Sequence, residues 1–281
     1  MKEAKKKKKN IILNVIIIIA VIGALISGYM IYTDVSEYQE GDNVYKDIAS
    51  DYVTITDENQ DSETQSPEPS QSADNDGEDG NGSSGSSGSS SKYVVDFNKL
   101  KKINSDIIAW IINDGTVINY PIVQGDDNTY YLTHLPNGTK NKLGSLFMDY
   151  RNSSDFSMRN TIIYGHHMKS GAMFASIVNY KKQSYYDKHP TMYLITPDTK
   201  YRIDLFSGYV SSVDEDSFTI NFIDDYAFET FVKERKEKSD FESDVQVTAS
   251  DRIITLATCT YEFSNARYVL YGKLTPIDSL S

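Results

Sequence analysis

The sequence has 281 residues and a net charge of −12. Six of its 28 Lys and Arg residues fall within the first ten positions beside a single acid, Glu3, so the remainder carries 22 basic and 39 acidic residues. A surface this acidic argues against nucleic acid as a partner, because phosphates require a basic face. The length would accommodate one or two domains, but the N-terminal third does not have a globular composition, so we expect one folded domain.

Residues 1–10 form a basic tail, and an uncharged, largely apolar run follows from Ile11 to Tyr32. About 20 apolar residues are enough for a helix to cross a bilayer, whereas the apolar part of a signal peptide usually has only about 7–15. We therefore interpret residues 11–32 as an uncleaved transmembrane anchor in the cell membrane. Positive charge stays on the cytoplasmic side, so we expect a single-pass protein with its N-terminus inside and the rest outside the cell.

The two segments that follow are polar. Residues 33–56 are mixed in composition and are expected to form a short juxtamembrane helix. Residues 57–91 are rich in Ser, Gly, Asp and Glu, contain no Lys or Arg, and cannot bury enough apolar surface to fold. A disordered linker of this length spans roughly 30 Å. We expect it to tether the folded domain at a distance from the membrane.

Residues 92–281 read as the folded domain. Asp96 is placed to cap a short helix, and further helices are expected near Met173 to Val178 and from about Asp224 to Lys238. Eight other segments are rich in β-branched and aromatic residues, which predicts strands: 110–112, 117–123, 145–149, 161–164, 191–196, 201–211, 252–260 and 267–274. Short strands with few helices predict a mainly β fold, a barrel or a sandwich, with peripheral helices.

The single cysteine, Cys259, lies near the end of one predicted strand. A lone cysteine cannot form an internal disulfide, so it is either a small buried hydrophobe or a reactive thiol. Arg267 opens the next strand, and antiparallel pairing would bring it alongside Cys259. A guanidinium there could bind a substrate backbone or stabilise an oxyanion, although an ordinary surface arginine is equally compatible with the spacing.

Four histidines are present, of which His166 and His167 follow a predicted strand through Gly165. A glycine there would let the chain turn sharply and expose the next side chain. A histidine at a strand exit is a plausible acid and base. We interpret His134 and His189, which lie beside loop or proline signals, as structural.

These motifs together resemble those of the sortases. Thr255-Leu256-Ala257-Thr258-Cys259 resembles the sortase TLxTC signature, with Arg267 where the family's essential arginine lies. Tyr164-Gly165-His166-His167-Met168-Lys169 resembles the catalytic-histidine segment of class B sortases, which assigns the catalytic role to His166. The segment from Trp110 to Leu132 also looks like class B, and the resemblance covers about residues 97–274.

The resemblance implies an eight-stranded β-barrel and a cysteine transpeptidase. Such an enzyme cleaves a C-terminal sorting signal after a Thr, forms a thioester on its cysteine, and passes the protein to a peptidoglycan precursor amine. Carried over, Cys259, His166 and Arg267 would be catalytic, and Asn128, Leu132 and Thr258 would bind the peptide. No metal or organic cofactor is implied. The partners would be surface proteins bearing a sorting motif, the peptidoglycan amine and the cell membrane.

Two departures and three alternatives accompany this interpretation. Position 257 is Ala where class B enzymes often have Ser, and the loop from Cys259 to Arg267 is short. An L,D-transpeptidase would place its cysteine in a different local sequence. A non-catalytic tethered adhesin or sensor would be expected to lack one of the three catalytic residues. A pilus-type sortase would usually carry a lid and a second membrane span.

Overall fold

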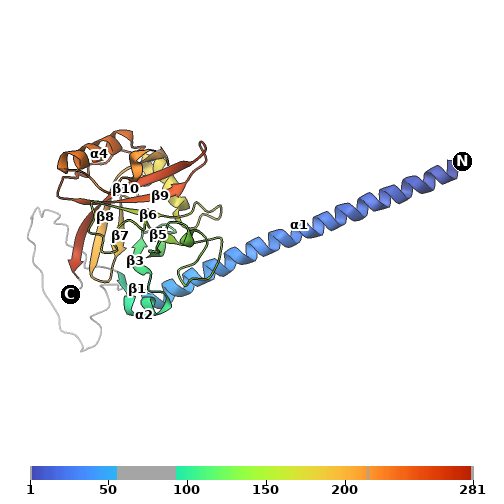
Figure 1. Cartoon of the computed structure of the whole chain (residues 1–281), viewed down its shortest axis with the longest axis horizontal. Helices are drawn as coiled ribbons and strands as arrows, with labels where there is room; N and C mark the ends of the chain where they lie inside the picture. The colour runs from blue at the N-terminus through green and yellow to red at the C-terminus, as the bar shows by residue number, and fades with distance from the viewer. Residues whose placement is uncertain (1, 56–92, 214, 280–281) are drawn as a thin grey trace, which may run out of the picture.

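The computed structural model describes residues 2–55, 93–213 and 215–279, and its centre is a closed barrel of eight strands (Figure 1). Around the barrel the strands run in the order β10-β8-β7-β3-β4-β5-β6-β9. Their bounds are β3 Ile107–Ile112, β4 Asn119–Val123, β5 Leu146–Met148, β6 Asn160–Tyr164, β7 Thr191–Ile195, β8 Thr199–Ser212, β9 Arg252–Cys259 and β10 Ala266–Ser279. The eight predicted strands are therefore all present, and the predicted barrel is confirmed.

Two strand pairs in the barrel are parallel, β4 with β5 and β6 with β9, and the other neighbours are antiparallel. Parallel strands end at the same edge of a sheet. The pairing of Tyr164 with Ala257 therefore brings the chain that leaves β6 beside the end of β9. This edge is where the sequence places both His166 and Cys259.

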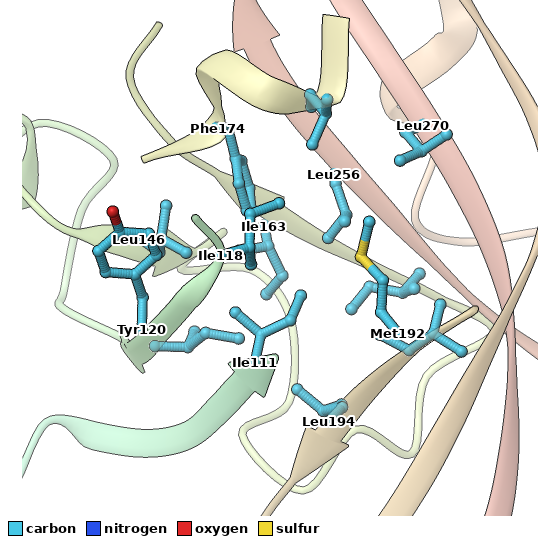
Figure 2. Packing of buried hydrophobic residues seen from close by; sticks show 14 of the residues in the cluster. Ile111, Ile118, Tyr120, Leu146, Ile163, Phe174, Met192, Leu194, Leu256 and Leu270 are labelled. Atoms are coloured by element: carbon cyan, nitrogen blue, oxygen red, sulfur yellow. The ribbon is translucent and has the colours of Figure 1, made fainter. Parts of the chain in front are cut away.

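The barrel interior is filled by apolar side chains from alternate strand positions, as the two-residue period of a strand requires (Figure 2). Ile111, Ile163 and Leu256 come from three different strands and are fully buried in this core. Phe174, from the 3₁₀ helix η2 (Phe174–Lys181), also packs here. The sequence predicted a helix at this position, and the structure shows that it is of the 3₁₀ type.

Helices cover parts of the barrel's outer face. Asp96 accepts a hydrogen bond from the Lys99 amide (3.0 Å) and caps α2 (Phe97–Ile103), as predicted. Asp224 caps α4 (Asp225–Lys238) in the same way, and the predicted stripe of α4 is buried against β8, β9 and β10. The remaining short helices are η1 (Tyr130–Leu132), α3 (Gln183–Tyr186) and η3 (Asp216–Phe218).

The long helix α1 (Lys2–Tyr52) extends away from the barrel, with only its C-terminal part against it (Figure 1). It includes one candidate membrane span, within Ile16–Tyr52, whose most apolar window has a mean hydropathy of 2.2 and is fully exposed. Farther along the helix, Tyr45 and Ile48 are buried against the barrel. Gly41 lies so close to Asn141 and Leu143 that a Cβ there would be 3.0 Å from both side chains. The segment interpreted as juxtamembrane is thus the docked end of one continuous helix.

The tether hypothesis needs correction. The linker predicted at residues 57–91 lies outside the described residues, but both of its flanks are described. On one side β1 (Val53–Ile55) follows α1 directly, and on the other β2 (Tyr93–Val95) leads into α2; the two pair antiparallel, with Ile55 opposite Tyr93. Because α1 already packs on the barrel before residue 56, the segment between β1 and β2 cannot set the distance between anchor and domain.

Candidate active site

A cleft of about 560 Å³ opens at the barrel edge where β6 and β9 end. All six residues proposed from the sequence line it: Asn128, Leu132, His166, Thr258, Cys259 and Arg267. Its other lining residues include Phe147, Arg151, Tyr164, Val213, Glu215, Asp216, Phe218, Thr219 and Ala257. We call Thr258, Cys259 and Arg267 the strand side of the cleft, and Asn128, Leu132 and Arg151 the loop side.

The strand side is built by the backbone ladder between β9 and β10, in which Arg267 lies directly opposite Cys259. Side chains at opposed positions share one face of the sheet, with Cβ atoms roughly 5 Å apart. Arg267 Nη1 donates to the Ala266 carbonyl (3.0 Å), which leaves the other guanidinium N–H groups for a partner in the cleft. The thiol of Cys259 is partly exposed and not disulfide-bonded. The predicted juxtaposition of these two residues is therefore confirmed.

His166 enters the cleft directly after β6. Its Nε2 lies 2.7 Å from the carbonyl oxygen of Leu132. A carbonyl only accepts, so Nε2 carries the hydrogen and Nδ1 is the nitrogen free to take or give a proton. The Leu132 carbonyl is thus the group that fixes the orientation and tautomer of this imidazole.

Gly165 positions His166 for a reason other than the one expected. Its φ is not in the left-handed region, so the turn itself does not demand glycine. Instead, a Cβ would lie 2.4 Å from Leu146 Cδ2 and 2.6 Å from Phe174 Cδ2. The glycine is required because the chain passes tightly over the barrel core.

Two hydrogen bonds join the histidine segment to the nucleophile strand. The Thr258 hydroxyl donates to the Gly165 carbonyl (2.8 Å), and His167 Nδ1 donates to the Cys259 carbonyl (2.8 Å). The Thr258 hydroxyl is already used in this way and the residue is buried, so its remaining route to a peptide is through its backbone. His167 thus supports the end of β9, and His166 is the histidine whose ring nitrogen remains available.

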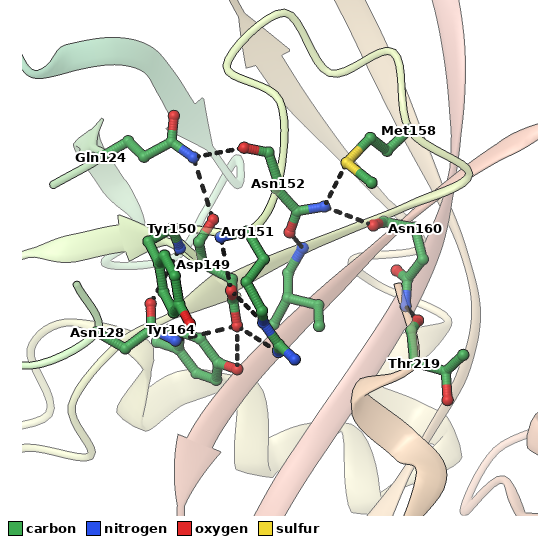
Figure 3. A network of polar contacts seen from close by, with 11 residues as sticks. Gln124, Asn128, Asp149, Tyr150, Arg151, Asn152, Met158, Asn160, Tyr164 and Thr219 are labelled. Carbon is green, nitrogen blue, oxygen red and sulfur yellow. Dashed lines mark hydrogen bonds and ion pairs between the residues drawn. The ribbon is translucent and has the colours of Figure 1, made fainter. Parts of the chain in front are cut away.

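The loop side depends on side chains rather than on a ladder. Asn128 precedes η1, and Leu132 ends it. Leu132 is partly exposed, so it offers an apolar surface, while the amide of Asn128 offers hydrogen bonds. Behind them lies Asp149, which accepts from Asn128, Arg151 and Tyr164 (Figure 3). Sequence reasoning missed this carboxylate, because its only signal was a place at the end of a short strand.

The noted departures have simple structural consequences. Ala257 is buried with a face on the cleft, so it adds no hydrogen bond where a Ser would. The short loop after Cys259 is held by Glu262, which bonds both Lys181 and Thr260. Among the described residues, no group of three or more His, Cys, Asp or Glu could hold a metal ion.

Comparison with known proteins agrees with this geometry. The sortase domain family matches residues 112–275. The sortase B of Listeria monocytogenes is 39% identical over 181 residues, covering 64% of this chain and 74% of that protein. A substrate complex of Staphylococcus aureus sortase B superposes with a TM-score of 0.62 at 38% identity, covering 65% of this chain and 85% of that one. Sortase B from Bacillus anthracis gives 0.66 at 32% identity, covering 85% and 97%.

A closed mixed barrel with a cysteine and an arginine opposed at its edge, beside an oriented histidine, defines a sortase-type cysteine transpeptidase. The chain belongs to the sortase family, and within it to class B.

Proposed function

We propose that this protein cleaves a C-terminal sorting signal after a Thr and transfers the new carboxyl end to a peptidoglycan amine. The observation that carries this proposal is the placement of Cys259 opposite Arg267, with His166 lining the same cleft. A related sortase B has been crystallised with substrate and another with triglycine, which supports a peptide donor and an amine acceptor of this kind.

In the proposed reaction, the Cys259 thiolate attacks the Thr carbonyl carbon, and the C–N bond to the next residue breaks. Nδ1 of His166 gives its proton to the departing amine, leaving a thioester on Sγ. The acceptor amine then attacks the thioester, His166 takes up its proton, and the thiolate is released. Arg267 stabilises the negative charge on the carbonyl oxygen in both steps.

The N-terminal helix fits an enzyme whose two substrates are membrane-bound. The apolar part of α1 would span the cell membrane, with its lysines in the cytoplasm and the barrel outside. A membrane-held catalyst meets membrane-held substrates at a high effective concentration. Since α1 packs on the barrel, this helix would set the position of the cleft relative to the bilayer.

The test uses the full chain in detergent, because Tyr45 and Ile48 of α1 are buried against the barrel. The protein is incubated with quenched peptides carrying varied residues around a central Thr, with and without triglycine, beside Cys259→Ala. We expect cleavage after Thr, a thioester mass on Cys259, and a triglycine adduct, none of them with Cys259→Ala. A folded protein that cleaves no peptide and whose Cys259 resists thiol reagents would instead indicate a non-catalytic surface protein.

A further inference from the structure

Asp149 is a buried carboxylate that contacts the loop side of the cleft from behind. It follows β5, and its side chain is 0% exposed. Four side-chain hydrogen bonds reach it: from Asn128 Nδ2 (3.1 Å), from Tyr164 Oη (2.9 Å), and from Nε and Nη2 of Arg151 (both 2.8 Å) (Figure 3). A buried carboxylate is costly unless its oxygens are fully paired, and here they are.

The three donors share two properties. Each lines the cleft, and each comes from a different segment: Asn128 from the loop after β4, Arg151 from the loop after β5, and Tyr164 from the end of β6. Tyr164 lies two residues before His166. One carboxylate therefore joins three separate parts of the cleft, one of them continuous with the histidine segment.

The contacts of Asn128 fix which way its amide points. Its Oδ1 accepts from the Tyr150 amide (3.0 Å), while its Nδ2 donates to Asp149. A backbone N–H can only donate and a carboxylate can only accept, so the amide cannot be reversed. Within the described part of the chain, no hydrogen bond uses the second amide hydrogen of Asn128, which leaves it for a ligand in the cleft.

The charge of the group is consistent with this role. Burial opposes ionisation of Asp149, but the hydrogen bonds from Arg151 and Tyr164 outweigh it and hold the pKa of the carboxyl below its ordinary value. Burial and the nearby charge of Asp149 raise the pKa of Tyr164, so its phenol keeps the hydrogen that it donates. The network is thus in one protonation state throughout the neutral range.

We propose that Asp149 is a positioning residue that holds Asn128, Arg151 and Tyr164 in the orientation that binds the peptide. This inference rests on the proposed function, since it concerns the peptide of that same reaction. Asp149 does not touch Cys259, His166 or Arg267, so it acts on how the peptide is held rather than on the thiol. The alternative is that Asp149 only stabilises the turn between β5 and β6.

The test compares Asp149→Asn with wild type in the full chain, using the best-cleaved peptide of the panel. The new amide has the same shape but presents N–H groups toward donors, so Asn128 and Arg151 lose their fixed orientation. We expect kcat/KM to fall about 10- to 100-fold, mainly through KM, because small misplacements of a bound substrate are expensive in rate. Alkylation of Cys259 by iodoacetamide should stay within about twofold of wild type, since that reagent does not use the peptide contacts.

Asp155→Asn is the matched control. Asp155 is an exposed carboxylate in the same β5–β6 connection, accepts from the Ser157 amide (2.9 Å), and does not line the cleft. It should cleave the peptide like wild type. Wild-type peptide kinetics for Asp149→Asn would overturn the inference while leaving the proposed function intact. A wild-type chain that cleaves no peptide would overturn the proposed function, and this inference with it.

A second measurement applies if Asp149→Asn does not fold. Asn128→Ala and Tyr164→Phe each leave the pair of Asp149 with Arg151 in place. These two side chains are linked through Asp149, so the double variant should lose no more than about twice what the weaker single variant loses. Multiplicative losses would show that the two residues act independently and would refute the positioning role.

Discussion

The two sides of the cleft are held by different kinds of interaction. On the strand side, Cys259 and Arg267 are opposed by the backbone ladder between β9 and β10. On the loop side, Asn128 and Leu132 lie in irregular chain, held by the Asp149 carboxylate and by short hydrogen bonds from other segments. The strand side would keep its geometry when one side chain changes, whereas the loop side depends on particular side chains.

The helix α1 contributes to the loop side from outside the barrel. The Tyr45 hydroxyl donates to the Gly144 carbonyl (2.6 Å). Gly144, with φ +59°, packs so tightly that a Cβ would be 2.7 Å from the Leu132 oxygen and 3.0 Å from His166 Cδ2. The membrane-linked helix thus supports the same stretch of chain that orients the histidine. This places part of the control of the loop side about 120 residues away in sequence from β6 (Figure 1).

The largest effect should come from the strand side, through chemistry alone. Arg267→Ala should lower kcat about 10²- to 10³-fold, because it removes the donor that stabilises the oxyanion. The unfolding temperature should hardly change, since the ladder that carries Arg267 is backbone. Arg202→Ala, which removes an exposed arginine paired with Asp204 on β8, is the control. Peptide cleavage within twofold of wild type would exclude Arg267 from catalysis.

Gly165→Ala tests the point where the two sides meet. The added methyl would lie 2.4 Å from Leu146 and 2.6 Å from Phe174, both in the packed core. Overpacking of this kind costs about 1–3 kcal/mol, and relief of the clash would move His166 away from Leu132. Denaturant unfolding and peptide kinetics should therefore worsen together. If stability is unchanged, the tight passage of the chain over the core is not a constraint.

Tyr45→Phe tests the support from α1. The ring, which packs edge-on against Tyr120 at 5.2 Å, would remain, but the buried Gly144 carbonyl would lose its donor. We expect a loss of about 1–3 kcal/mol in unfolding free energy and a fall in kcat of only severalfold. Tyr38→Phe, on the half-buried face of the same helix, should be silent in both measurements. Equal effects of the two variants would show that the Gly144 contact has no special role.

The smallest effect concerns the loop that joins the two strands of the strand side. Hydrogen bonds from Lys181 and Thr260 lower the pKa of Glu262 to about 2, from an ordinary value of 4.5. A depressed carboxyl pKa stabilises the fold above the unfolded value, and this contribution is lost as the pH falls from about 4.5 to about 2. Because Glu262 is substantially exposed, Glu262→Gln should cost no more than about 1 kcal/mol at neutral pH.

Urea unfolding of Glu262→Gln and wild type at pH 7, 4 and 3 measures this directly. The gap between the two proteins should narrow as the pH falls, since the wild type then loses the same ion pair. A gap that is constant across these pH values would show that the Lys181 contact does not stabilise the folded loop.

Local sequence signals were sufficient for the strand side. The apolar alternation of β9 and β10, with a short polar loop between Cys259 and Arg267, already required an antiparallel pair and hence their juxtaposition. The caps at Asp96 and Asp224 were predicted for the same reason, because a helix N-terminus is satisfied by a residue within the segment itself. Features whose partners are close in sequence can be predicted from sequence.

The loop side and the course of α1 were decided only by tertiary structure. Asp149 gains its importance from Asn128 and Tyr164, which lie 21 positions before it and 15 positions after it. The docking of α1, which overturned the tether hypothesis, depends on Tyr45 meeting a carbonyl 99 positions away. Composition and periodicity register what lies within a turn or a strand. They do not register a hydrogen bond between segments that only the closed barrel brings together.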